Sequence, residues 1–140
     1  MFEELAIGPQ PLCKEDLIFL RDSGIESILS VCYENEIKIL EEIKEVFNHR
    51  VFSLPDHKTG KLPSLDEVYE VIEIINQLAK IGPVYVHCFA GIERSPLVCM
   101  AYLVINHRLK PQQALDYLMQ VHPGTNPLTN QLNLLKFLEK

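Results

Sequence analysis

The stretch that decides the fold reads Val84-Tyr85-Val86-His87-Cys88-Phe89-Ala90-Gly91-Ile92-Glu93-Arg94-Ser95. Its first residues are apolar on both pleats, which predicts a buried strand over 84–87 at the centre of a parallel sheet. A helix is predicted from 95 to 106, directly after the loop. Because ligands of such sheets bind beyond the carboxyl ends of the strands, the residues after Val86 are predicted to form a site.

The rest of the chain alternates strands and helices around this stretch. Further strands are predicted at 26–31 and 50–54, and further helices at 13–23, 35–46, 65–81, 111–121 and 128–139. Ser64 is the predicted N-cap of the third of these helices. This alternation predicts an α/β fold with a central, mostly parallel sheet of four to five strands and helices on both faces. Repeats, low-complexity tracts and linkers are lacking, so residues 1–140 are predicted to form one domain.

Composition excludes several classes of protein. Of the 140 residues, 47% are hydrophobic and 23% are charged, which is typical of globular proteins and not of disordered chains. The 13 Lys and Arg against 19 Asp and Glu give a net charge of −6, so nucleic acid is not an expected partner. The longest apolar run, 97–105, is too short to cross a bilayer, and the acidic start at 1–4 is unlike a targeting peptide. We therefore expect a cytoplasmic protein without a membrane anchor.

The four cysteines are Cys13, Cys32, Cys88 and Cys99. They form no Cys-x-x-Cys pair and have no histidine at zinc-finger spacing, so no metal site is expected. Reduced thiols are expected in an unexported chain. Apart from any chemistry, each cysteine is predicted to be a small buried hydrophobic side chain.

Cys88 and Arg94 bracket a loop with Gly91 at its middle. Backbone N–H groups of a tight loop at a helix N-terminus form a cradle for an anion, and Gly91 permits the positive φ that such a turn can need. Arg94 adds a planar guanidinium suited to two phosphate oxygens. A thiol in so positive a setting ionises readily, which predicts that Cys88 is a nucleophile aimed at phosphorus.

The pattern His87-Cys88-x-x-Gly91-x-x-Arg94-Ser95 resembles the active-site motif of the cysteine-dependent protein tyrosine phosphatases, particularly the small, atypical dual-specificity branch. The resemblance covers nearly the whole chain, because three further segments match in order and spacing: Leu5-Ala6-Ile7-Gly8-Pro9-Gln10-Pro11, the strand before Cys32, and Leu54-Pro55-Asp56 followed by Pro63-Ser64. The chain has no Trp, so Leu54-Pro55-Asp56 stands where large tyrosine-specific members have Trp-Pro-Asp. No segment resembles their phosphotyrosine-recognition loop, which predicts a shallower cleft and dual specificity.

The resemblance implies a role for each residue of the site. Cys88 would be the nucleophile, Ser95 would donate to its thiolate, and His87 would bond the loop backbone and orient the sulfur. The phosphate would be bound by Arg94 and the loop between, namely Phe89, Ala90, Gly91, Ile92 and Glu93. A nucleophile of this kind needs a general acid for the leaving oxygen, and Asp56, at the end of a strand on the same edge of the sheet, is the candidate.

The expected function is therefore hydrolysis of phosphotyrosine, and of phosphoserine and phosphothreonine, in phosphorylated protein substrates. It would proceed through a cysteinyl-phosphate in a monomer without cofactors. Alternatives are a catalytically weak phospho-binding module, and a phosphatase acting on a non-protein phosphate such as a phospholipid or an RNA 5′ end. Sulfurtransferases and arsenate reductases also centre on a cysteine in an anion cradle. Cys32 matches the backdoor cysteine of lipid-phosphatase relatives, which implies a redox partner for Cys88.

Overall fold

The computed structural model describes residues 4–55, 63–88, 94–122 and 129–138. Within these ranges, strands alternate with helices along most of the chain. The elements are β1 (Leu5–Ile7), α1 (Lys14–Asp22), β2 (Ser27–Ser30), the 3₁₀ helix η1 (Glu34–Glu36), α2 (Leu40–Val46), β3 (Asn48–Val51), α3 (Leu65–Ala79), β4 (Val84–His87), α4 (Arg94–Asn106), α5 (Pro111–Val121) and α6 (Thr129–Leu135).

The sheet has four parallel strands in the order β1-β4-β2-β3 in the described part of the chain. All residues of β2 and β4 are buried, as expected for inner strands covered on both faces. The predicted α/β fold with a parallel sheet is confirmed, and 84–87 is an inner strand as its apolar sequence indicated. The carboxyl end of β4 leads directly to Cys88.

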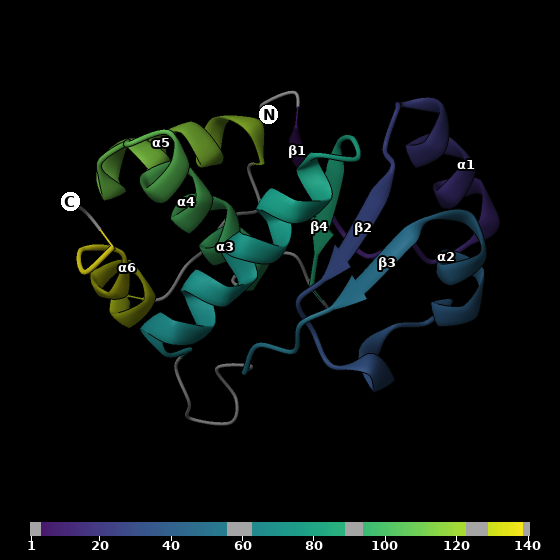
Figure 1. Ribbon diagram of the computed structural model, residues 1–140, viewed down its shortest axis with the longest axis horizontal. Helices are drawn as coiled ribbons and strands as arrows, with labels where there is room; N and C mark the ends of the chain where they lie inside the picture. Colours follow the sequence, from purple (N-terminus) through teal and green to yellow (C-terminus); the bar gives the residue numbers. More distant parts are fainter. Residues whose placement is uncertain (1–3, 56–62, 89–93, 123–128, 139–140) are drawn as a thin grey trace.

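Helices cover both faces of this sheet. Figure 1 shows α1 and α2 on one side and α3, α4, α5 and α6 on the other. In α4, every residue from Arg94 to Val104 is buried, because this helix packs against the sheet, α3, α5 and α6. A helix that is apolar on all sides can be stable only in such a central position. The start of α4 is thereby held rigidly beside the end of β4.

Two helix boundaries follow the sequence signals. Gly24, just after α1, has a φ of +95°, a conformation that glycine adopts without strain. Ser64 caps α3: its Oγ accepts the Glu67 N–H at 3.1 Å, and the Glu67 carboxylate accepts the Ser64 N–H at 2.9 Å. This reciprocal capping box confirms the predicted start of the helix.

Two predictions of local structure were wrong, and one strand was missed. The predicted helix 35–46 is a 3₁₀ turn at 34–36 followed by α2, which begins only at Leu40. The strand predicted at 50–54 lies at 48–51. β3 is an edge strand in which Asn48 and Arg50 are exposed, so its sequence is too polar to show the apolar pattern of a buried strand. β1 was not predicted, since its three residues are too few to show a period.

The prediction that Cys13 is buried was also wrong, whereas Cys32, Cys88 and Cys99 are buried. Cys13 stands immediately before α1, whose core-facing side chains are Leu17 and Leu20. The thiol precedes this apolar face and stays in solvent.

Candidate active site

The site is built where β4 ends and α4 begins. Cys88 follows the last residue of β4 and is 1% exposed, and Arg94 is the first residue of α4 and is 2% exposed. The predicted phosphate-binding residues Phe89, Ala90, Gly91, Ile92 and Glu93 lie outside the described residues, as does the predicted acid Asp56. The described part of the site is therefore the nucleophile candidate, the arginine and the groups that hold them.

Ser95 lies against the sulfur of Cys88. Its Oγ is 3.3 Å from Cys88 Sγ, and both side chains are buried. Because Ser95 belongs to the first turn of the buried helix α4, its hydroxyl is fixed relative to the end of β4. A hydroxyl at this distance can donate a hydrogen bond to a thiolate and stabilise its negative charge.

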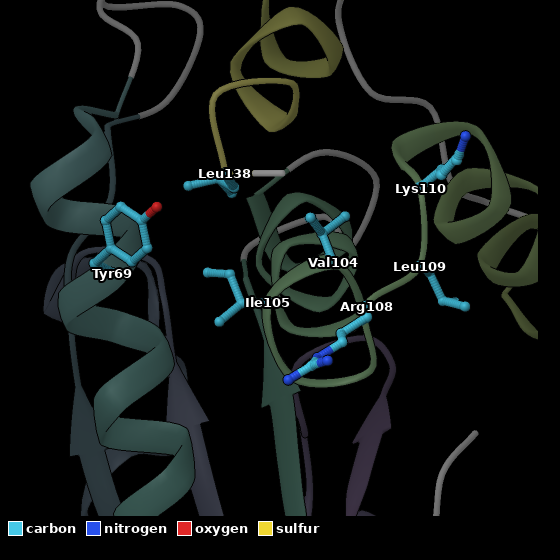
Figure 2. A pocket seen from close by; sticks show the side chains of 7 residues that line it. All are labelled: Tyr69, Val104, Ile105, Arg108, Leu109, Lys110 and Leu138. Carbon is cyan, nitrogen blue, oxygen red and sulfur yellow. The ribbon is translucent and has the colours of Figure 1, made fainter. Parts of the chain in front are cut away.

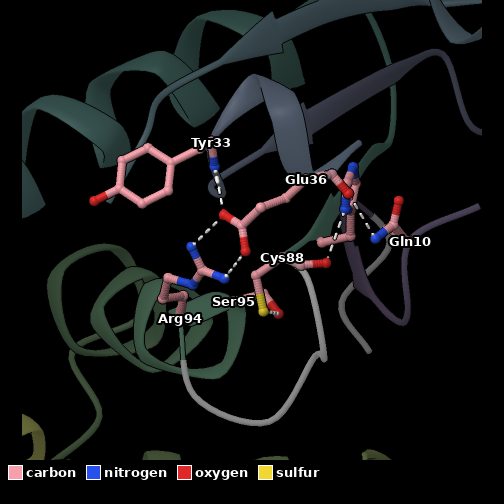
Figure 3. A network of polar contacts seen from close by, with 7 residues as sticks. Gln10, Tyr33, Glu36, Cys88, Arg94 and Ser95 are labelled. Carbon is pink, nitrogen blue, oxygen red and sulfur yellow. Dashed lines mark hydrogen bonds and ion pairs between the residues drawn. The ribbon is translucent and has the colours of Figure 1, made fainter. Parts of the chain in front are cut away.

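The guanidinium of Arg94 is held by Glu36 of η1. Arg94 Nη1 donates to Glu36 Oε1 and Nη2 donates to Oε2, both at 3.0 Å, in a planar two-bond pair (Figure 3). The side chains are 3% and 19% exposed, so the pair is mostly shielded from water. The Tyr33 N–H donates to Glu36 Oε1 at 2.8 Å and fixes the carboxylate in turn. The plane of the guanidinium is thus set by the turn after β2.

Gln10 holds that turn in place. Its buried side chain donates from Nε2 to the Glu36 carbonyl at 3.0 Å and accepts the Lys38 N–H on Oε1 at 3.1 Å. The segment carrying Gln10 is anchored to β4 by Tyr85, whose hydroxyl donates to the Pro9 carbonyl at 2.7 Å. These bonds explain why residues 37–39 leave the predicted helix.

Gly8 allows this segment to pack closely against Tyr85 of β4. A Cβ on Gly8 would collide with the Tyr85 phenol, so the close approach of the segment to β4 requires glycine. The segment from Gly8 to Gln10 therefore connects the central strand to the turn that holds the arginine.

His87 contacts the backbone of Cys88, the candidate nucleophile. Its Nδ1 is 3.1 Å from the Cys88 carbonyl oxygen and its Nε2 is 2.6 Å from Ser30 Oγ. Burial lowers the pKa of His87 to about 4, so the ring is neutral at physiological pH. A neutral imidazole facing a carbonyl oxygen must donate, which makes His87 a donor to the backbone of Cys88.

The other two buried thiols remain protonated. Burial, reinforced by the Glu36 carboxylate, raises the pKa of Cys32 to about 12. Burial inside α4 also raises the pKa of Cys99 far above its ordinary value. Cys32 nevertheless lies close to the site, since Ser30 pairs directly with His87 and Cys32 follows it by two residues.

Sequence analysis did not identify Glu36, Gln10 or Ser30. Glu36 was assigned to a helix by its neighbours' pattern, although a carboxylate just beyond the carboxyl end of β2 is a natural partner for an arginine beyond β4. The buried Gln10, between Pro9 and Pro11, gave no signal that composition or periodicity could detect.

A cavity of about 570 Å³ lies at the opposite end of α4 and is not part of this site (Figure 2). Tyr69, Val104, Arg108 and Leu138 are among the residues that line it. Val104 of α4, which lines it, lies about 15 Å along the helix from Arg94 at 1.5 Å per residue. Among the described residues there is no cluster of three or more His, Cys, Asp or Glu side chains that could bind a metal ion. None of the helices in the described ranges has the length and apolar character needed to span a membrane.

Comparison with known proteins identifies the family of this chain. A family model described as the dual specificity phosphatase catalytic domain matches residues 8–140. The chain is 29% identical over 140 residues to the dual specificity protein phosphatase PHS1 of Arabidopsis thaliana, covering 99% of this chain but only 15% of that protein. It is 25% identical over 139 residues to the phosphatidylglycerophosphatase and protein-tyrosine phosphatase 1 of Homo sapiens, covering 96% of this chain and 69% of that protein.

Among solved structures, Tk-PTP in its active form superposes with a TM-score of 0.83 at 23% identity, over 99% of this chain and 92% of that chain. This likeness concerns the fold, whereas the family match also includes the residues around Cys88 and Arg94. The chain belongs to the dual-specificity phosphatase family of catalytic domains, within the cysteine-dependent protein tyrosine phosphatases.

Proposed function

We propose that this domain hydrolyses phosphomonoesters of phosphotyrosine, phosphoserine and phosphothreonine in proteins, through a cysteinyl-phosphate on Cys88. The observation that carries the proposal is the position of the Cys88 sulfur. It lies at the end of the inner strand β4, 3.3 Å from Ser95 Oγ, beside an arginine fixed by Glu36. This arrangement supports the roles of nucleophile for Cys88, leaving-group donor for Ser95 and phosphate-binding cation for Arg94.

In the first step, the Cys88 thiolate attacks phosphorus and the bond from phosphorus to the ester oxygen breaks. Arg94 and the loop amides hold the equatorial oxygens, whose charge is spread in the transition state. The ion pair with Glu36 keeps the guanidinium plane fixed, so little reorganisation is needed when phosphate binds. Asp56 gives its proton to the departing oxygen.

In the second step, a water attacks the cysteinyl-phosphate while Asp56, now ionised, accepts a proton from it. The S–P bond breaks, inorganic phosphate leaves, and the sulfur departs as a thiolate. The Ser95 hydroxyl donates to this thiolate and makes it a better leaving group. Asp56 ends protonated and Cys88 ionised, as at the start of the cycle.

Replacing Asp56 by asparagine tests the acid. For alkyl phosphates, whose leaving oxygen needs a proton, we expect kcat to fall by about 10²–10⁴-fold. For p-nitrophenyl phosphate, whose leaving group is stable as an anion, we expect a smaller loss. Steady-state kinetics on both substrates measure the difference. Equal losses on the two would show that another group is the acid. Asp66→Asn, in the first turn of α3, is the matched control.

The substrate class is tested by competition between protein and lipid phosphates. A protein substrate is supported by the sequence of the loop, which has Glu93 and no Lys or Arg between Cys88 and Arg94 and so disfavours highly charged headgroups. A phospholipid substrate is the second candidate, because one relative is named a phosphatidylglycerophosphatase as well as a protein-tyrosine phosphatase. A panel of phosphopeptides and vesicles containing phosphatidylglycerophosphate, compared by kcat/KM, should favour the peptides. Preference for the vesicles would reverse the assignment.

We further propose that Cys32 protects Cys88 from irreversible oxidation. Peroxide oxidises the Cys88 thiolate to a sulfenic acid with release of hydroxide, and the Cys32 thiol then condenses with it to a disulfide with release of water. The pKa of Cys32, about 12, makes its thiolate scarce. The condensation should therefore accelerate as pH rises, since attack requires the thiolate.

After mild peroxide treatment, peptide mass spectrometry should detect a Cys32–Cys88 disulfide, and dithiothreitol should restore activity. In Cys32→Ser, the same treatment should carry Cys88 to the sulfinic acid, with activity that dithiothreitol does not restore. Cys13→Ser is the control, since this exposed thiol is remote from the core. Detection of sulfinic Cys88 without any disulfide in the unmodified protein would disprove the protective role.

A further inference from the structure

Three side chains from neighbouring strands form a hydrogen-bonded chain that ends at the nucleophile. His49 of β3, Ser30 of β2 and His87 of β4 lie on adjacent strands of the sheet (Figure 1). His49 Nε2 is 2.8 Å from Ser30 Oγ, Ser30 Oγ is 2.6 Å from His87 Nε2, and His87 Nδ1 is 3.1 Å from the Cys88 carbonyl. His49 is half-buried, whereas Ser30 and His87 are fully buried.

The chemistry of the four groups fixes the direction of every bond. The Cys88 carbonyl can only accept, so His87 Nδ1 carries the proton and the Nε2 of this neutral ring accepts. Ser30 must then donate its one proton to His87, which leaves its oxygen to accept from His49. Nε2 of His49 therefore carries a proton. All three donors point the same way, from β3 toward Cys88.

The bond to the Cys88 carbonyl favours the His87 tautomer with the proton on Nδ1, but Ser30 by itself fits either tautomer. A hydroxyl can donate or accept, and a serine turned the other way would accept a proton from His87 Nε2. His87 would then present a lone pair to the Cys88 carbonyl and lose its bond to the loop backbone. The tautomer of His49 that carries its proton on Nε2 opposes this arrangement, because its N–H occupies the acceptor side of the Ser30 oxygen and leaves the O–H to His87. Hydrogen bonds in such a chain also polarise and strengthen one another.

We propose that His49 is a positioning residue of the nucleophile loop: through Ser30, it holds His87 in the tautomer that donates from Nδ1 to the Cys88 carbonyl. The inference rests on the proposed function, in which Cys88 is the nucleophile. His49 touches neither substrate nor sulfur. Its effect is on the orientation of the Cys88 backbone. It also acts on the His87 Nδ1–H, the partly positive group that faces Cys88.

Two substitutions at the same position separate the hydrogen bond from packing. His49→Phe keeps a ring but has no donor, whereas His49→Gln can place an N–H close to the position of Nε2. For His49→Phe we expect kcat with p-nitrophenyl phosphate to fall about twofold to tenfold, the value of one neutral hydrogen bond, with little change in KM. His49→Gln should restore most of this loss. His107→Phe, in the exposed turn after α4, is the control and should behave as the unmodified protein.

Two readouts do not depend on phosphatase activity. Nitrogen-15 NMR of the His87 ring should show a protonated Nδ1 in the unmodified protein and in His49→Gln, and a mixture of tautomers in His49→Phe. The rate of Cys88 alkylation by iodoacetamide, measured against pH, should reach half its maximum at higher pH in His49→Phe. The label is quantified on the Cys88 peptide, because Cys13 is exposed and reacts as well.

Unchanged NMR and alkylation profiles in His49→Phe would overturn the proposal, as would a loss in His49→Gln equal to that in His49→Phe. If His49→Phe does not fold, Ser30→Ala, which removes only the connecting hydroxyl, should give the same shifts in both profiles. If the protein hydrolyses no phosphate ester but the His87 tautomer and Cys88 alkylation respond as stated, the proposed function fails and the positioning role stands.

Discussion

Replacement of Cys88 by serine is expected to abolish turnover of p-nitrophenyl phosphate, with a loss on the order of 10⁴–10⁶-fold, as when a covalent nucleophile is removed from other enzymes. A serine hydroxyl is scarcely ionised at neutral pH, so it cannot replace a thiolate in the attack on phosphorus. Phosphate binding should persist, because Arg94 and its partner Glu36 are unaffected. Hydrolysis assays and calorimetric titration with inorganic phosphate measure the two quantities separately.

The control for this variant is Cys99→Ala on α4, a buried thiol that the proposed reaction does not use. It is expected to lose stability through the deleted sulfur but to keep its turnover per folded molecule. Substantial phosphatase activity in Cys88→Ser would assign the chemistry to another residue. Loss of phosphate binding together with turnover would indicate a collapsed site.

With p-nitrophenyl phosphate as substrate, Arg94→Lys is expected to lower kcat/KM by about 10²–10³-fold, the cost of removing one oriented donor to a transition-state anion. Lysine is a point charge and cannot make two parallel bonds to Glu36 while also binding phosphate. The loss should be shared between kcat and KM, since phosphate is bound in both the ground state and the transition state. Steady-state kinetics with p-nitrophenyl phosphate measure it.

Two further variants define this result. Arg21→Lys, in the exposed last turn of α1, should be kinetically silent. The kcat/KM of Glu36→Gln should lie between those of Arg94→Lys and Arg21→Lys. The amide of glutamine can still accept a bond from Arg94 but no longer balances its charge. If Arg94→Lys retained the kcat/KM of the unmodified protein, the planar guanidinium would have no special part in phosphate binding.

Sequence reasoning succeeded where the information is local. The apolar stretch at 84–87 and the long apolar helix after it identify the inner strand and the buried helix α4. The backbone positions of Cys88 and Arg94 follow from these two elements. Ser64 likewise indicates the start of α3, because its capping partner Glu67 is only three residues away.

It failed where contacts between distant residues override local pattern. Gln10 bonds the turn after β2 from 26 and 28 residues away, and the helix that periodicity predicted from residue 35 begins only after this turn, at Leu40. Glu36 meets Arg94 across 58 residues, and Ser30 meets His87 across 57. Such pairs depend on strand order and register, which neither propensity nor periodicity encodes. The roles of Glu36, Gln10 and Ser30 in supporting the site therefore came only from the structure.

Direct detection of phosphate on the sulfur of Cys88 tests the account at its centre. A single turnover of p-nitrophenyl phosphate, quenched rapidly in denaturant and digested, should yield a Cys88 peptide that carries one phosphoryl group. This adduct should accumulate in Asp56→Asn, where hydrolysis of the intermediate is slowed, and be lacking in Cys88→Ser. Turnover with no phosphorylated cysteine at any time point, or with phosphate on a different residue, would contradict the mechanism.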